Sequence, residues 1–299
     1  FTLICPFIFG QLSINGTIKP MIMFNISDQD QMNLPFRFGH LRMGYTMGDF
    51  DLLVNSALEL RWGDNQSSNF KLREAYGTWF TSWGEIKFGK QIHAWGVADG
   101  NNPTDNLNPY DYYYMFLQGA DRKIGSLSLS VSSYWNNWQL EGLIIPSHVA
   151  NRLPFNEPEF PFQISIEPNE YEKRANSLEY GFQLKTVIAE TDIGISYFDG
   201  YDRSFSLLGI DTLNILQLNP KFGYRSTSVI GLNMVTFIKD FTLRIESALF
   251  STINDYKAKW YNYLDAKADY LQYVIQFEYR MENSKTIGAQ LIGNNILKV

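Results

Sequence analysis

The sequence predicts an all-β protein, an antiparallel up-and-down transmembrane β-barrel, and three observations carry this prediction. Apolar and polar residues alternate with a period of two along most of the chain, which is typical of strands with two different faces. Many alternating segments run to about 9–13 residues, longer than the usual globular strand and long enough to cross a membrane at a tilt. Tight turns and long loops also follow one another in strict alternation.

Composition narrows the class of protein. The 299 residues are 45% hydrophobic and 16% aromatic, yet 19% are charged and the mean hydropathy is -0.21. The apolar residues are therefore dispersed, whereas a transmembrane helix needs about 20 consecutive apolar residues. The single cysteine, Cys5, excludes a disulfide framework and a Cys-rich metal site. A net charge of -6 argues against a nucleic-acid partner.

The first ten residues differ from the rest of the chain. Residues 1–10 are almost wholly apolar, but they include Pro6 and are too few to span a membrane. We interpret residues 1–10 as the remnant of a secretory signal peptide. Residues 11–299 then form a single β-barrel domain, which we expect to be truncated at its C-terminus. Bacterial barrels have an even number of strands, so we expect about 14–18 strands in the complete barrel and about 13 here.

The alternation is clearest in four places. Residues 50–62 place aliphatic and aromatic side chains on one face and charged side chains on the other, and residues 178–184 and 271–280 do the same. Between Ser126 and Ser132, serines alternate with leucines and a valine. A helix would instead repeat its apolar residues three and four positions apart. The expected strands are 11–25, 36–47, 50–62, 69–81, 84–92, 122–134, 137–145, 176–188, 191–199, 222–238, 241–252, 267–281 and 286–298.

The connections between these strands alternate in length. Short turns are expected at 48–49, 82–83, 135–136, 189–190, 239–240 and 282–285, and long loops at 26–35, 63–68, 93–121, 146–175, 200–221 and 253–266. Outer-membrane barrels have short periplasmic turns and long outward loops, so the first strand would run outward. Aromatic residues gather near both ends of the strands, as expected for interfacial girdles: Trp79, Phe80, Trp83, Trp135 and Trp138 at short turns, and Trp260, Tyr261, Tyr263 and Tyr270 on the long-loop side.

If the apolar face meets lipid, the polar face lines a water-filled lumen. The predicted pore-lining residues are Arg42, Asp51, Glu59, Arg61, Lys71, Arg73, Lys87 and Gln91, and the same parity places Glu246 inward. The five cations would form a basic wall that favours anionic solutes. The alternative is that these charges are neutralised by partners such as Asp51 and Glu59. Glu74 falls on the apolar face of its strand, which indicates a β-bulge or an interfacial position.

The loop 93–121 carries the least common pattern. It repeats an Asn-Pro-x-Asp element, at Asn102 to Asp105 and at Asn108 to Asp111, and then presents Tyr112, Tyr113 and Tyr114. Asn before Pro favours the start of a turn, and its side chain can cap the following backbone. We therefore expect an ordered loop that narrows the pore. The predicted constriction residues are Trp95, Asp99, Asn108, Asp111, Tyr112 and Tyr113.

These motifs resemble those of a family of Gram-negative outer-membrane porin-like proteins whose substrates are largely unassigned. The matching pieces are Arg73-Glu74-Ala75-Tyr76, Gly89-Lys90-Gln91, Trp95-Gly96 and Asn108-Pro109-Tyr110-Asp111, in that order over about 40 residues. The resemblance implies a barrel in the bacterial outer membrane that passes small molecules. It names no solute.

The function we expect is a porin-like channel for passive passage of small solutes. Two alternatives are an uptake channel for apolar compounds, with Tyr112–Tyr114 as an aromatic track, and a non-conducting adhesin or structural barrel. No Gly-x-Ser-x-Gly or His-Glu-x-x-His pattern occurs, so we expect no enzyme, no metal and no cofactor. The inward serines of 126–132 could include a nucleophile, and Asp99, Asp105 and Asp111 could bind Ca²⁺, but polar lining explains both more simply. Expected partners are outer-membrane lipid, small solutes, the barrel-assembly machinery and further copies of the chain in a homo-oligomer.

Overall fold

The computed structural model describes residues 10–63, 68–162, 164, 166–174, 176–214, 217–257, 261, 267–281 and 285–298. Residues 1–9 of the predicted signal remnant, residues 1–10, lie outside this range. The described chain is all-β, as predicted. Its strands are β1 (Gln11–Ile18), β2 (Phe36–Met47), β3 (Phe50–Leu60), β4 (Asn69–Thr81), β5 (Gly84–Gln91), β6 (Ser126–Trp135), β7 (Trp138–Ile145), β8 (Glu179–Ile188), β9 (Thr191–Tyr201), β10 (Ser206–Asn214), β11 (Gln217–Gly223), β12 (Ser226–Ile238), β13 (Phe241–Ile253), β14 (Lys267–Arg280) and β15 (Thr286–Lys298).

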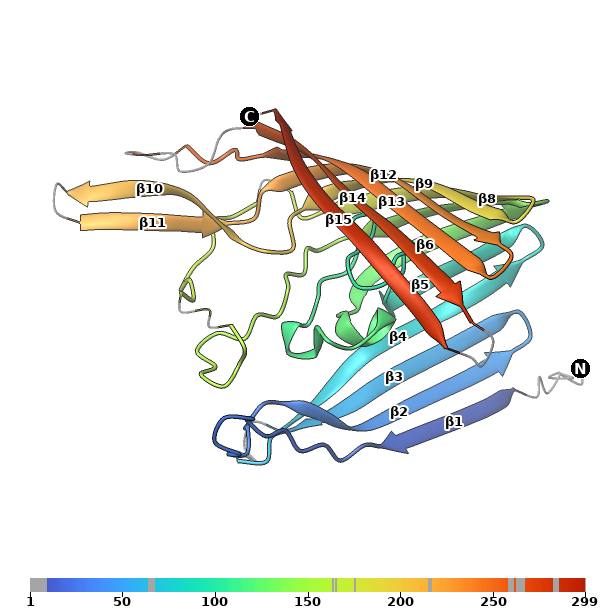
Figure 1. Cartoon of the computed structure of the whole chain (residues 1–299), viewed down its shortest axis with the longest axis horizontal. Helices are drawn as coiled ribbons and strands as arrows, with labels where there is room; N and C mark the ends of the chain where they lie inside the picture. Colours follow the sequence, from blue (N-terminus) through green and yellow to red (C-terminus); the bar gives the residue numbers. More distant parts are fainter. Residues whose placement is uncertain are drawn as a thin grey trace, which may run out of the picture.

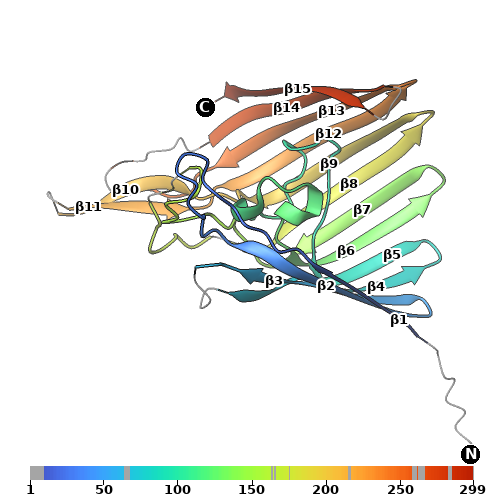
Figure 2. The ribbon, with the colours of Figure 1, turned by 60° about the horizontal axis from the view of Figure 1, so that its bottom comes forward.

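Thirteen strands form one antiparallel sheet in chain order, with β9 paired directly to β12. Strands β10 and β11 form a separate two-stranded hairpin. Figures 1 and 2 show that the large sheet is strongly curved and that long segments of chain lie on its concave side. Its edge strands are β1 and β15, and no pairing joins the two edges within the described residues. The architecture is therefore an up-and-down meander with an inner and an outer face.

The two faces are inverted relative to a water-soluble protein. On β6, Leu127 and Leu129 are 45% and 41% exposed, whereas Ser128 and Ser130 between them are 0% and 4% exposed. The other strands of the sheet also expose leucine, isoleucine, phenylalanine and tryptophan on the outer face. Water-soluble folds bury such side chains and expose the polar ones. The outer face thus suits a surrounding that is itself apolar.

The expected turn rhythm is present. Tight turns join β2 to β3, β4 to β5, β6 to β7, β8 to β9 and β12 to β13, and a short connection joins β14 to β15, whereas longer connections follow β1, β3, β5, β7, β9 and β13. Trp79, Trp83, Trp135 and Trp138 are exposed at the tight-turn end, as predicted. Tyr270 was expected in the opposite girdle, but it faces inward and stacks on Phe250. Trp260 and Tyr263 lie outside the described residues.

Several expected strand boundaries are wrong, and the largest differences are at three strands. The first strand ends at Ile18 rather than residue 25, since Pro20 has no N–H for the sheet ladder. The expected loop 200–221 contains most of the β10–β11 hairpin, and the expected strand 222–238 begins at Ser226. The strand expected from residue 122 begins at Ser126, because Gly119–Arg122 forms a one-turn 3-10 helix, η3. A second such helix, η2, spans Tyr112–Tyr114.

A β-bulge in β4 explains the anomaly at Glu74. Asn55 of β3 pairs with Glu74, but Ser56 pairs with Leu72, so Arg73 is the extra residue. The bulge turns Glu74 to the inner face, where it accepts a hydrogen bond of 3.0 Å from the Asn55 amide. Across the described residues, none of the helices has the length and apolar character that a membrane-crossing helix requires.

Candidate functional site

The segment between β5 and β6, residues 92–125, folds onto the inner face of the sheet. We call it the inner loop. Trp95 and Leu107 of this loop are buried among inward-facing apolar side chains of four strands, namely Leu143, Ile145, Phe198, Val229, Ala248 and Phe250. The Trp95 ring lies so close to Gly181 of β8 that a Cβ there would be 2.6 Å from it. The inward position expected for this loop is therefore observed.

Glu246 of β13 fixes one side of the inner loop. Its carboxylate accepts hydrogen bonds from the backbone N–H groups of Val97 and Ala98 (2.5 Å for Ala98) and from the hydroxyl of Thr104 (2.9 Å). The Glu246 side chain is fully buried. A buried carboxylate that accepts several N–H and O–H groups is well stabilised, so this cradle holds the loop in one place.

The inner loop also reaches β14 and β15. The backbone N–H of Asp99 donates to Gln276 of β14 at 2.9 Å, and Gln290 of β15 donates to the Asp99 carbonyl at 2.8 Å. The predicted constriction residue Asp99 is itself exposed and lies 3.8 Å from Arg244. The loop therefore extends across the concave face toward the β15 edge.

The second Asn-Pro-x-Asp element closes the base of the loop. The Asn108 side-chain amide donates to the carbonyls of Gln91 and Ile124, each at 3.0 Å, and its oxygen accepts from the His93 N–H at 2.6 Å. Asn108 thus joins the two stems of the loop instead of capping the backbone that follows it, which was the expected role. Gln91 is buried and donates to the Ser128 carbonyl.

The two aspartates of these elements have separate cationic partners. Asp105 forms a buried ion pair with Lys123, and Asp111 lies 3.1 Å from Arg152. Asp99, Asp105 and Asp111 therefore do not share one site. Across the described residues, no group of three or more His, Cys, Asp or Glu side chains has the arrangement of a metal site.

Arg152, from the loop after β7, ties the inner loop to β3. Its guanidinium binds both carboxylate oxygens of Glu59 at 2.8 Å, and the Tyr114 hydroxyl donates to Glu59 at 2.8 Å. Burial raises the pKa of the Asp111 carboxyl and outweighs the opposing effect of Arg152. Burial lowers the pKa of Arg152, but the bonds to Glu59 and Asp111 outweigh it and raise that pKa overall. This cluster is a second anchor, opposite the Glu246 cradle.

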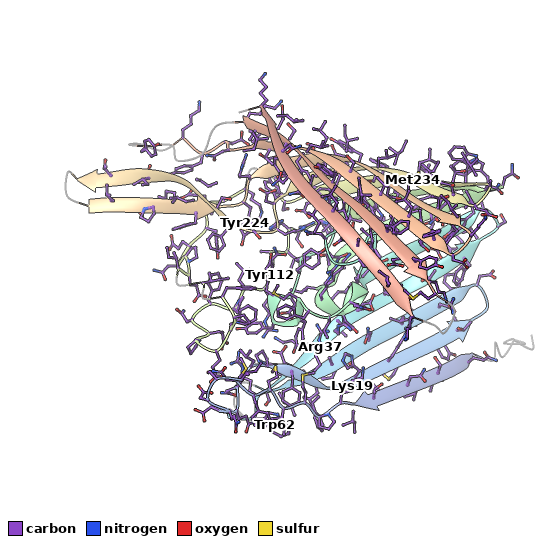
Figure 3. All side chains as sticks on the ribbon, viewed as in Figure 1. Lys19, Arg37, Trp62, Tyr112, Tyr224 and Met234 are labelled. Atoms are coloured by element: carbon purple, nitrogen blue, oxygen red, sulfur yellow. The ribbon has the colours of Figure 1, made fainter. Side chains whose placement is uncertain are left out.

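Tyr112–Tyr114 forms η2 within this anchor. Tyr113 donates to Glu157 at 2.7 Å, and burial together with this bond raises its pKa to about 12. The Arg37 guanidinium lies 3.8 Å from the centre of the Tyr114 ring, a cation–π contact. Figure 3 places Arg37 and Tyr112 on the inner side of the curved sheet.

The predicted basic wall is largely paired. Arg61 binds Glu157, Arg73 lies 2.9 Å from Asp121, and Lys87 lies 2.7 Å from Glu85. Arg42 and Lys71 form no ion pair with any described residue. Asp51 and Glu59, the neighbours expected to supply neutralising charge, do not pair with these five cations. The neutralising charge comes mainly from loops.

Several site residues were not predicted. Glu246 was expected to face inward, but its contact with the inner loop was not. Arg152, Glu157, Asp121 and Lys123 lie in loops or at their ends, where no periodic pattern marks the direction of a side chain. Their charges were visible in the sequence, but their partners depend on how the loops fold back.

Two cavities flank the inner loop. The larger, about 580 Å³, lies between the loop and strands β9 and β12–β15. The smaller, about 490 Å³, lies between Ala94–Asn102 and Met115–Lys123. Gly100, Asn102 and Asp105 line both. The tip of the loop therefore separates two spaces on the concave face.

A serine, a histidine and a glutamate lie in a row on the inner face, and the serine and the histidine are within hydrogen-bonding distance of each other. The His93 Nε2 atom lies 2.9 Å from the Ser128 hydroxyl, and its Nδ1 atom lies 3.6 Å from Glu141. Ser128 is fully buried and lines neither flanking cavity. The Trp95 indole N–H donates to the same Glu141 at 3.2 Å, so these side chains help to fix the inner loop against the sheet.

No protein-family model and no curated protein matches the sequence. Solved structures of outer-membrane proteins are similar to the chain. In-vitro folded OmpT, an outer membrane protein of Vibrio cholerae, is 11% identical with a TM-score of 0.45, over 97% of this chain and 88% of that one. OmpF of Salmonella typhi, in complex with daunomycin, is 9% identical with a TM-score of 0.44, over 97% and 81%.

Proposed function

We propose that this chain is an outer-membrane β-barrel protein that passes small solutes passively through a polar lumen, which the inner loop narrows. One observation carries the proposal. The sheet presents apolar side chains outward and polar side chains inward, and a long loop is bound to the inward face. In the hydrocarbon region of a membrane, backbone N–H and C=O groups must form hydrogen bonds within the protein. A meander of strands with an apolar exterior meets this requirement once its two edge strands are paired.

The cavities support passage rather than a solid plug. The inner loop is fixed at Glu246 on one side and at Glu59 on the other, and cavities of about 580 and 490 Å³ remain around its tip. A loop held across a lumen sets the size limit for solutes. Because the loop is anchored by buried ionic groups, the opening has a defined shape.

The ionic pairs bear on selectivity. Three of the five wall cations have carboxylate partners, whereas Arg42 and Lys71 have no carboxylate partner among the residues that the structure describes. We therefore propose at most a weak preference for anions, smaller than a wall of five free cations would give.

Single-channel recording of the full-length protein in a planar bilayer tests this proposal. We expect steady conductance and, under a salt gradient, a reversal potential slightly on the anion side of zero. Arg42→Gln combined with Lys71→Gln is expected to remove that preference, whereas Arg61→Gln, which breaks a pair, is expected to shift it toward cations. Absence of conductance from folded, inserted protein would sink the channel proposal and favour a non-conducting anchor.

An uptake channel for apolar compounds has less support. Such a channel would use Tyr112–Tyr114 as an open aromatic track. Tyr113 and Tyr114 instead donate to Glu157 and to the buried Glu59, and their rings lie against arginine side chains. These rings anchor the loop, so the proposal assigns them no direct contact with a solute.

Catalysis is not part of the proposal. The contact between His93 and Ser128 is the one a nucleophilic serine needs, but no substrate could reach a fully buried hydroxyl. Assembly into oligomers and engagement of the barrel-assembly machinery remain predictions.

A further inference from the structure

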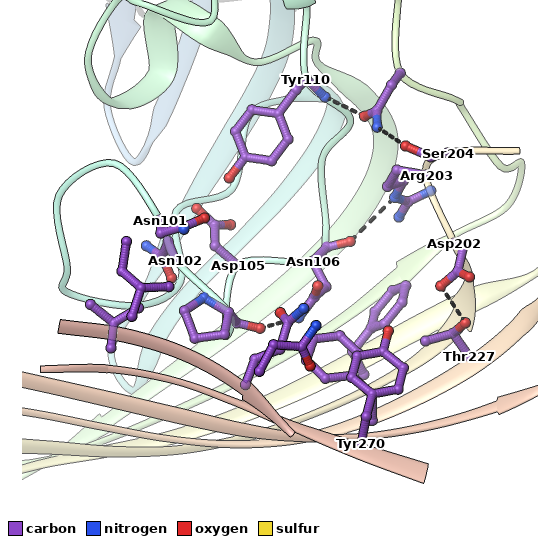
Figure 4. A pocket seen from close by; sticks show the side chains of 18 of the residues that line it. Asn101, Asn102, Asp105, Asn106, Tyr110, Asp202, Arg203, Ser204, Thr227 and Tyr270 are labelled. Carbon is purple, nitrogen blue, oxygen red and sulfur yellow. Dashed lines mark hydrogen bonds between the residues drawn. The ribbon is translucent and has the colours of Figure 1, made fainter. Parts of the chain in front are cut away.

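The larger cavity has an unusual chemical lining for a charged channel. Around its 580 Å³ lie asparagine, glutamine, serine and tyrosine side chains from the inner loop, from the loop after β9 and from β14 and β15. Figure 4 shows Asn101, Asn102, Asn106 and Tyr270 from two sides of this space. The volume falls within the range of about 300–1,000 Å³ found for small-molecule sites.

The charged groups of the lining are already compensated. Arg203 lies 2.8 Å from Glu179 and donates to the carbonyls of Leu107 (2.8 Å) and Asn106 (3.2 Å). Asp105 is paired with Lys123, and Asp202 accepts a hydrogen bond of 2.6 Å from Thr227. A charged ligand would therefore have to compete with existing partners.

Three amide side chains of the lining can form hydrogen bonds with a ligand. Gln272 of β14 and Asn294 of β15 stand opposite each other in the strand register, and both line the cavity. Neither side chain, nor that of Asn101, makes a hydrogen bond with any described residue. Each such amide offers two donor hydrogens and an acceptor oxygen. The hydroxyl groups of a ligand both donate and accept hydrogen bonds, so they can bond to both ends of these amides.

An aromatic stack forms one wall. The Tyr270 ring lies on Phe250 with centroids 4.7 Å apart and planes 3° apart, and Tyr270 also lines the cavity. Phe250 is buried, whereas Tyr270 is only partly so. An aromatic ring beside amide groups offers contact to the C–H side of a ring-shaped polyol and hydrogen bonds to its hydroxyls.

We propose that this cavity binds a neutral, polyhydroxylated solute, such as a small saccharide, during its passage. This inference rests on the proposed channel function and adds a substrate class to it. The Tyr270 ring and the Gln272 and Asn294 amides make the contacts, and the compensated charges exclude ionic ligands.

The test uses the full-length protein and sucrose as the probe, with a polyethylene glycol of similar mass as the control probe. We expect sucrose to interrupt the single-channel current with saturable concentration dependence, and polyethylene glycol to lower it without saturation. Tyr270→Ala is expected to raise the half-saturating sucrose concentration about tenfold. Ile275→Ala changes the outer face of the same strand and is expected to leave that concentration unchanged.

Calorimetric titration of sucrose into detergent-folded protein gives a second readout that needs no conductance, and Gln272→Leu is a second variant if Tyr270→Ala does not fold. Conductance without saturation by sucrose, and without binding heat, would overturn this inference and leave the channel proposal intact. Binding heat that Tyr270→Ala abolishes, in a protein that does not conduct, would support the site and overturn passage. Tighter, Tyr270-dependent binding of gluconate than of sucrose would show that the ligand class is wrong.

Discussion

At the scale of single residues, Glu246 positions the inner loop. Its carboxylate accepts hydrogen bonds from three residues of that loop, at a site from which water is excluded. Hydrogen bonds to a charged group contribute about 1.5–3 kcal/mol each, more than bonds between neutral groups. The Glu246 side chain is therefore one of the groups whose charge determines the position of the loop.

Glu246→Gln is expected to loosen the inner loop. An amide keeps the size of the side chain but replaces one acceptor oxygen by a donor, so at least one loop contact is lost. We expect a loss of about 1.5–3 kcal/mol in stability and larger current fluctuations in single-channel recordings. Glu85→Gln is the matched control, since Glu85 lies on the same face and its side chain, among the described residues, hydrogen-bonds with Lys87 and Tyr134 and not with the inner loop. Equal noise in both variants would contradict the anchoring role.

His148 gives the fold a dependence on pH. Its Nδ1 atom lies 2.7 Å from Glu179 and 3.1 Å from Arg203, and its side chain is 1% exposed. Burial, aided by the positive charges of Arg203 and Arg174, lowers its pKa and outweighs the attraction of Glu179. The other groups that face the ring are Tyr201 and Tyr224.

Acidification is expected to destabilise the protein through His148. A histidine whose folded pKa is lowered contributes stability above its ordinary value of about 6.5, and this contribution is lost as the pH falls through the folded pKa. Uptake of one proton limits the slope to about 1.4 kcal/mol per pH unit. Urea unfolding between pH 7.5 and pH 5 (roughly the range in which histidine titrates) should show a shallower pH dependence for His148→Asn than for the parent protein. Identical slopes would refute this account.

Side-chain direction could be predicted from sequence only where a strand imposes it. The parity of β13 placed Glu246 inward, and the mismatch at Glu74 indicated either a bulge or an interfacial position, of which the structure shows the bulge. The partners of Arg61 and Arg73 were not predictable, because Glu157 and Asp121 come from loops about 96 and 48 residues away in the chain. An irregular loop has no repeating backbone geometry, so the sequence does not show which way its side chains point.

At the scale of elements, β6 shows the inversion most simply. Its serines face the inner loop and its leucines face outward, so the strand has a polar face toward the interior and an apolar face toward the outside. Strand existence was predicted well for such segments because the alternation is strict. The β10–β11 hairpin was missed, since it lies outside the main sheet and its position is set by tertiary contacts rather than by a two-faced pattern.

Leu129→Lys tests whether the outer face of β6 meets lipid. A lysine near the middle of the membrane is expected to cost about 2–4 kcal/mol of folding free energy in lipid vesicles. The measurement is reversible urea unfolding in vesicles, with Leu129→Met as the apolar control. A cost below about 0.5 kcal/mol, as for ordinary surface substitutions, would mean that this face is not in hydrocarbon.

At the scale of the whole molecule, the alternation of turns and loops fixes a direction. The tight turns share one end of the sheet, and the loop 146–178 emerges at the other (Figure 2). Outer-membrane barrels place short turns in the periplasm, so the long loops are expected outside the cell.

Cysteine labelling of intact cells tests this orientation. In a Cys5→Ser background, Glu170→Cys in a long loop should react with a membrane-impermeant maleimide, and Asp240→Cys in a tight turn should react only after the cells are opened. The reverse pattern would invert the proposed topology. Labelling of both positions in intact cells would place the protein outside the outer membrane.

The anchors of the inner loop also bear on how the chain folds. Val97 and Glu246 are 149 residues apart in sequence, and Asp99 and Gln290 are 191 residues apart. Contacts this distant close large loops of unfolded chain and therefore form slowly. The inner loop gains its cradle only after β13–β15 are in place, so strands synthesised much later than the loop complete the interior that the first half of the chain began.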